Sequence, residues 1–98
     1  MVIKVLDIVS QCYTNEDGQK VYDKIWPVLM RGENVVLSFE GVDTTPSSFI
    51  NSALIQLLGV MDFDQIKQRL KIIKTTKQIN NMIRQRFEFE INRVKTQK

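Results

Sequence analysis

Histidine is absent from this 98-residue sequence, and cysteine occurs only once, at Cys12. Histidine is the usual general base of enzymes and the commonest metal ligand, so its absence excludes much catalytic and metal chemistry. One cysteine can complete neither a zinc site nor an intrachain disulfide. Neither of the standard glycine-rich phosphate-binding loops is present. We therefore expect a protein that is not an enzyme and that has no metal and no cofactor.

Long apolar runs are also missing, because no stretch approaches the roughly 18–20 residues that a membrane span requires. The segment Met1–Val9 lacks the charge and small-residue pattern of a signal peptide, and Asp7 interrupts it. A single cysteine fits a reducing compartment. Hydrophobic residues make up 43% of the sequence, which is enough for a core at this length. We expect one soluble, cytoplasmic domain that covers residues 1–98.

Cys12 allows two interpretations. It precedes the first predicted helix, and a helix N-terminus can lower the pKa of a thiol and make it reactive. Free cysteine also packs often as a small buried hydrophobe, and we favour this second interpretation.

Hydrophobic patterning predicts three strands that alternate with helices. Val2–Val9 is almost continuously apolar and rich in β-branched residues, which is typical of a strand covered on both faces. Glu33–Phe39 and Leu70–Lys74 supply the second and third strands. The alternation of strands and helices predicts an α/β fold, a β-α-β-α-β-α domain with a mostly parallel sheet of about three strands.

The first two long helices have clear boundaries. Thr14 can cap the first helix, and Gly32 can end it in the left-handed conformation. Thr45 is predicted to cap the second, with Pro46 at its first helical position and Gly59 at its end. Apolar residues repeat in this second helix as adjacent pairs every four residues: Phe49, Ile50, Ala53, Leu54, Leu57 and Leu58.

The last part of the chain predicts a short helix and a long one. Asp62–Arg69 is a short helix capped by Asp62. Thr75 or Thr76 caps the final helix. The apolar stripe of that helix consists of Ile79, Met82, Ile83, Phe87, Ile91 and Val94.

The most informative stretch runs from Val35 to Ile50, as a strand, a polar turn and a helix that opens with Ser47 and Ser48. The carboxyl end of a strand is where α/β sheets usually bind ligands. A phosphoryl group there would gain hydrogen bonds from first-turn N–H groups and a favourable dipole interaction. The stretch therefore suits a phosphoserine switch or a docking phosphate. The alternative is that Thr45, Ser47 and Ser48 only satisfy helix-end donors.

Two pieces of this stretch resemble the STAS-like domain family of bacteria. They are Leu37–Val42 (Leu-Ser-Phe-Glu-Gly-Val) and Ser47–Leu54 (Ser-Ser-Phe-Ile-Asn-Ser-Ala-Leu). Glu16–Gly18 and Arg69–Ile72 are similar to that family as well. The resemblance extends from about residue 12 to residue 87 and implies a small STAS-like α/β fold.

The resemblance also implies a relation to the anti-sigma-factor antagonists, which a partner kinase of the GHKL ATPase type phosphorylates on serine. The acceptor serine of those proteins lies in an Asp-Ser-Ser/Thr-Gly motif that opens a helix after a strand. Ser47 matches the acceptor serine, and Ser48 matches the hydroxyl residue after it. Pro46 stands at the position of the aspartate, and Phe49 stands at that of the glycine.

The leading hypothesis is therefore a non-enzymatic regulatory module that contacts a partner protein. The resemblance implies that this partner is a GHKL-type ATPase or kinase and that phosphorylation at Ser47 switches the contact. The residues expected at the partner contact are Thr44, Thr45, Ser47, Ser48 and Phe49.

Charge is distributed unevenly along the chain and gives a second hypothesis. Residues 1–70 carry six basic and nine acidic side chains, whereas residues 71–98 carry eight basic and two acidic ones. The basic third could bind nucleic acid, with affinity that falls steeply as salt rises. The residues expected at that contact are Lys77, Arg84, Arg93 and Lys95, with Arg86 as a further candidate. The alternative is a solvated helix face.

A third hypothesis is a structural role as a homodimer. Phe89 lies off the main apolar stripe of the last helix, and with Val94 it would extend an exposed patch. The alternative is fraying of a terminal helix.

Overall fold

The computed structural model describes residues 1–96 of the chain, with side chains described through Arg93. Its strands are β1 (Val2–Lys4), β2 (Val35–Ser38) and β3 (Leu70–Ile73). Its helices are α1 (Val5–Ile8), α2 (Asn15–Met30), α3 (Ser47–Ala53), the 3-10 helix η1 (Ile55–Gly59), α4 (Phe63–Arg69) and α5 (Lys77–Thr96). The predicted α/β fold with a three-stranded parallel sheet is confirmed. No helix among these residues is both long enough and apolar enough to cross a membrane.

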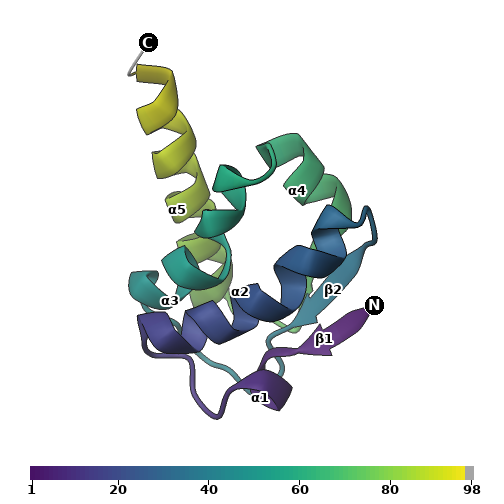
Figure 1. The fold of residues 1–98 in the computed structure, drawn as a ribbon. Helices are drawn as coiled ribbons and strands as arrows, with labels where there is room; N and C mark the ends of the chain where they lie inside the picture. Colours follow the sequence, from purple (N-terminus) through teal and green to yellow (C-terminus); the bar gives the residue numbers. More distant parts are fainter. Residues whose placement is uncertain (97–98) are drawn as a thin grey trace.

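The strands lie in the order β1-β2-β3 and all run parallel. Figure 1 shows β1 beside β2. Both crossovers join neighbouring strands in the same direction, and right-handed crossovers of this kind place their helices on one face of the sheet. The burial of β2 agrees with this arrangement, because Val35 and Leu37 are fully buried whereas Val36 between them is half-buried. The hydrophobic core therefore lies between the sheet and the helical layer.

The first strand is shorter than predicted. Strand pairing in β1 ends where Lys4 meets Ser38, which is the last residue of β2. Beyond that point the neighbouring strand offers no backbone partner, so the chain turns into the single helical turn α1. The N–H of Val9 closes this turn by donating to the carbonyl of Val5 at 3.1 Å. The prediction of one strand over Val2–Val9 was wrong, although Val5 is fully buried as a covered strand residue would be.

The helical layer is built around the close packing of α2 on α3. The capping box at Thr14 and Asp17 fixes the start of α2 and confirms the predicted cap. One turn later, the buried Gly18 faces α3 so closely that a Cβ atom there would lie 2.5 Å from the carbonyl oxygen of Phe49. The same Cβ would lie 2.8 Å from the Cβ of Ser52. Glycine is required at this position because the two backbones approach each other directly.

The second predicted helix is divided in the structure. α3 ends at Ala53, and after Leu54 the chain continues as the tighter η1, which ends at Gly59 as predicted. Asp62 caps α4 with a capping box that includes Gln65, which confirms the predicted cap. The last helix is capped by the side chain of Thr76, whose Oγ1 accepts a hydrogen bond from the N–H of Ile79 at 3.3 Å.

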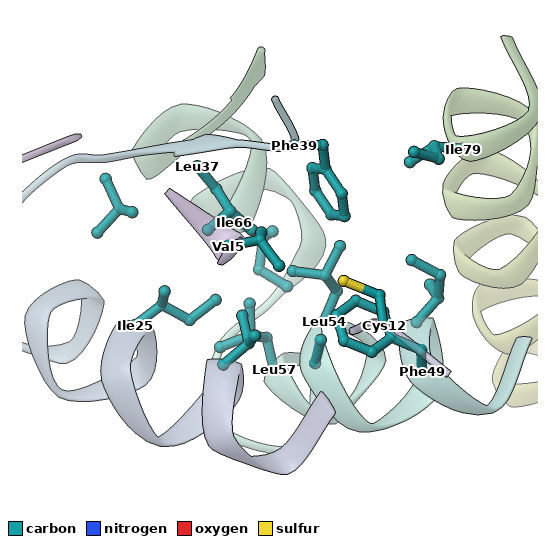
Figure 2. Close-up of a cluster of buried hydrophobic side chains, with 14 of the residues drawn as sticks. Val5, Cys12, Ile25, Leu37, Phe39, Phe49, Leu54, Leu57, Ile66 and Ile79 are labelled. Atoms are coloured by element: carbon teal, nitrogen blue, oxygen red, sulfur yellow. The ribbon is translucent and has the colours of Figure 1, made fainter. Parts of the chain in front are cut away.

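Buried apolar side chains from the sheet and the helices meet in one cluster (Figure 2). Cys12 belongs to this cluster and is almost fully buried. Burial, helped by the charge of Asp17, raises the pKa of the Cys12 thiol to about 11. The thiol is thus kept protonated at neutral pH, which supports the interpretation of Cys12 as a packed filler.

Candidate functional site

The segments that follow the three strands meet at one end of the sheet, because all three strands run parallel. The hydroxyl of Thr76, after β3, donates to the carbonyl of Asp43, after β2, at 2.7 Å. The hydroxyl of Ser48 in α3 donates to the carbonyl of Tyr13, in the segment before α2, at 3.5 Å. The polar turn and the two serines therefore lie on a surface that three parts of the chain build together.

A glutamine from the last helix holds the turn in place. The side-chain amide of Gln78 accepts a hydrogen bond from the N–H of Thr45 at 3.0 Å and donates one to the carbonyl of Thr45 at 3.1 Å. Both backbone groups of one loop residue are thereby paired by one side chain, much as a neighbouring strand would pair them. The loop before Ser47 is fixed by this contact and not by regular secondary structure.

The predicted cap of α3 was wrong. Pro46, and not Thr45, is the residue before the first helical position, and no side chain caps the first turn. The hydroxyl of Thr45 points into the protein instead, where the residue is only 2% exposed and its Oγ1 has no hydrogen-bond partner. The physical reason is the pairing with Gln78, which fixes the backbone of Thr45 and leaves its side chain on the inner side.

The five residues expected at the partner contact do not all reach the surface. Thr44 and Ser47 are exposed, and Ser48 is half-buried. Phe49 is fully buried in the core and Thr45 nearly so, so the expectation that these two side chains contact a partner is corrected. Tyr13, which is 62% exposed, stands beside Ser48 and takes their place on this surface. We call Tyr13, Thr44, Ser47 and Ser48 the serine surface.

A shallow hollow of about 260 Å³ adjoins the serine surface. Its lining includes Ser10, Gln11, Asp43 and Thr44, and Cys12 lies at its inner side. The Cys12 thiol has a raised pKa, so it is not an activated nucleophile. Among the residues whose side chains are described, no group of three or more cysteine, aspartate or glutamate side chains could hold a metal ion. The arrangement offers polar contacts and hydrogen bonds.

A family model described as a STAS-like domain of unknown function matches residues 17–80, which is more than half of the chain. The chain belongs to this family. The match confirms the resemblance seen in the sequence and contains β2, α3, α4 and β3 together with Ser47 and Ser48. Comparisons with curated proteins and with solved structures found no match.

The STAS-like domain does not bring its predicted nucleic-acid contacts together. Lys77 and Arg84 are seven residues apart on α5 and share one face, whereas Arg93 lies half a turn away on the opposite face. Arg93 forms an ion pair with Glu90 at 2.9 Å. Lys95 lies outside the residues whose side chains are described. The nucleic-acid hypothesis stays a prediction, and Lys77, Arg84 and Arg93 do not form one contact surface.

Arg86, the further candidate for nucleic-acid contact, forms polar contacts with other residues of the chain. Its Nε donates to Oδ1 of Asn51 on α3 at 2.6 Å, and its guanidinium pairs with Glu90 at 3.0 Å. The two arginines that surround Glu90 hold the pKa of that carboxyl below its usual range. Arg86 therefore joins α5 to α3.

The homodimer hypothesis is likewise untested. Phe89 is 57% exposed on α5, with the guanidinium carbon of Arg86 5.1 Å from the centre of its ring. Val94, its expected neighbour in the patch, lies outside the residues whose side chains are described.

Two residues that build the site, Tyr13 and Gln78, were not singled out in the sequence, and Thr76 was predicted only as a cap of the final helix. The parallel strand order alone indicates that the segments after β1, β2 and β3 meet at one edge, so Tyr13 and Thr76 could have been suspected. Gln78 gives no such signal, because a glutamine in the first turn of a helix is ordinary. Its role depends on the place of α5 in three dimensions.

Replacing Thr45 with valine should raise the free energy of unfolding by about 1 kcal/mol, because a methyl group would replace a buried hydroxyl without a partner. The backbone pairing with Gln78 would remain intact. Urea denaturation monitored by circular dichroism measures the change. Thr44→Val, at the exposed neighbouring threonine, is the matched control and should change stability by less than about 0.5 kcal/mol. A loss of stability in Thr45→Val would show that the hydroxyl has a partner after all.

Proposed function

We propose that this STAS-like domain is a non-enzymatic regulatory module that contacts a partner protein through the serine surface. The observation that carries the proposal is the geometry at Ser47. The hydroxyl is exposed, while the loop before it is held by the two hydrogen bonds of Gln78. A fixed loop that presents exposed hydroxyl groups loses little conformational entropy when a partner binds.

We further propose that phosphorylation of Ser47 switches the contact and that the partner is a GHKL-type ATPase with kinase activity. The support for this step is the family resemblance together with the exposure of Ser47. A phosphoryl group adds close to two negative charges and three strong acceptors, so it changes a contact surface without any change of fold. The absence of a capping side chain leaves the first turn of α3 open beside it.

A charge at Ser47 should change partner affinity at least about tenfold, because charge in a contact surface adds repulsion or desolvation cost. The tagged domain is first used to capture GHKL-type ATPases from its native host. The affinity of each captured ATPase for the Ser47→Asp and Ser47→Ala variants is then measured by titration calorimetry. Gln68→Glu adds a negative charge at an exposed position of α4 and is the matched control, which should bind as the unmodified protein does. Equal affinity of Ser47→Asp and Ser47→Ala for the partner would contradict the proposal that phosphorylation of Ser47 switches the contact.

The modification itself can be read from intact mass spectrometry of the domain isolated from its native host. A species heavier by one phosphoryl group, lost in Ser47→Ala, would support phosphorylation at this residue. The same species in the Ser47→Ala protein would place the phosphate elsewhere and contradict the assignment.

A further inference from the structure

An apolar cavity of about 430 Å³ is lined by residues of α4 and β3 on one side and of α5 on the other, and no residue of the serine surface lines it. Its inner wall is formed by Leu54, Ile66 and Phe87, all of which are buried. Ile83 and Ile91 line it from α5 and are half-buried. The volume falls within the range of about 300–1,000 Å³ that small-molecule sites occupy, and the lining is apolar as such sites require.

The cavity follows from the way that the last helix packs. The residues of α5 that face it recur at three- and four-residue spacing, so they form one stripe of the helix. Across from that stripe, the ring of Phe63 on α4 packs against Phe87 with the ring centres 5.2 Å apart. This contact holds the two helices together at one point and leaves the apolar side chains around it incompletely covered.

Two cations stand in the lining of the cavity, one from each wall. Lys67 on α4 lies with its Nζ 5.1 Å from the centre of the Phe63 ring, and Arg84 on α5 donates to Oδ1 of Asn81 at 2.8 Å. Neither cation forms an ion pair with a carboxylate among the described residues. Glu88 is the one acidic residue of the lining, so the charge around the opening is net positive. An anion at this opening would meet an ammonium and a guanidinium that have no carboxylate partner.

We infer that this cavity binds a small molecule with an apolar body and a single anionic head group, such as a medium-chain carboxylate. The apolar body would occupy the space next to Leu54, Ile66 and Phe87, and the head group would lie between Lys67 and Arg84. The inference goes beyond the proposed function and does not depend on it, since no residue of the serine surface lines the cavity.

Decanoate and decanol are matched probes, because they share the chain of ten carbons and differ in the charge of the head group. Each is titrated below its micelle-forming concentration into protein labelled with carbon-13 at the isoleucine methyl groups. The signals of Ile66, Ile83 and Ile91 should shift, whereas that of Ile25, a buried residue of α2 that does not line the cavity, should stay unchanged. Decanoate should bind about tenfold more tightly than decanol, the effect of charge-assisted contacts at the opening.

The double variant Lys67→Gln/Arg84→Gln should lose this tenfold preference while it binds decanol as before. Both residues are exposed, so the fold should be retained, and Lys20→Gln/Lys24→Gln on α2 is the control for a loss of two charges elsewhere. Three results would each overturn the inference. They are the absence of methyl shifts with decanoate, an unchanged preference in the double variant, and cavity signals that already depend on protein concentration. The last of these would mean that a second copy of the chain covers the cavity.

Discussion

Replacing Gly18 with alanine should lower the free energy of unfolding by about 2 kcal/mol, as expected for an extra carbon forced into a packed interface. Helix propensity alone predicts the opposite, since alanine in a helix interior is favoured over glycine by roughly 1 kcal/mol. The packing term should prevail because the new Cβ would meet the carbonyl oxygen of Phe49 at 2.5 Å. That oxygen belongs to the backbone of α3, so relief requires one whole helix to move. In thermal denaturation we expect the midpoint to fall by about 10 °C.

Gly59→Ala is the matched control for this substitution. A Cβ at Gly59 would have no atom within 4 Å, so the change should stay within about 0.5 kcal/mol. If Gly18→Ala proved as stable as Gly59→Ala, then α2 and α3 would not be in direct backbone contact, and the description of the helical layer given above would be wrong.

The second large effect is expected for Gln78→Ala, which should lower the free energy of unfolding by about 2 kcal/mol. The variant removes two hydrogen bonds and leaves the N–H and the carbonyl of Thr45 without partners in a partly buried loop. The amide proton of Thr45 should also lose its protection against hydrogen exchange, which nuclear magnetic resonance measures directly. Because the loop leads into Ser47, partner affinity should fall in the same variant.

Gln85→Ala provides the comparison, since Gln85 is an exposed glutamine on the same helix. It loses the same amide group but no contact with the loop, and its stability and its exchange pattern at Thr45 should match those of the unmodified protein. Equal protection of the Thr45 amide in the two variants would show that the loop is rigid without Gln78.

The sequence patterns predicted the succession of strands and helices along the chain, the parallel direction of the strands and the positions of the long helices. They failed where a boundary depends on a partner distant in the chain. The run Val2–Val9 has one apolar character throughout, yet β1 ends at Lys4 because β2 ends at Ser38. The third strand ends at Ile73, one residue before the predicted end, because Lys74 takes a left-handed φ of 57° that a strand cannot continue.

The candidate site shows the same division. The exposure of Ser47 and Thr44 agrees with their expected place in a polar turn. Phe49 was expected both in the apolar stripe of its helix and at the partner contact. Its full burial confirms its place in the stripe and contradicts a contact with a partner. The hydrogen bonds between the Gln78 side chain and the backbone of Thr45 join residues 33 positions apart. No local pattern encodes such a contact, which is why the cap at Thr45 was predicted wrongly.

The boundaries of the family match have a practical consequence for anyone who isolates this domain. Residues 17–80 include neither β1 nor most of α5. A fragment cut at those limits would expose one side of β2 to solvent and would lose the core residues Val5 and Phe87. It would keep Gln78 and Ser47 but would lack most of α5, the helix that positions Gln78. We therefore expect the smallest autonomously folding unit to extend beyond residues 17–80 in both directions.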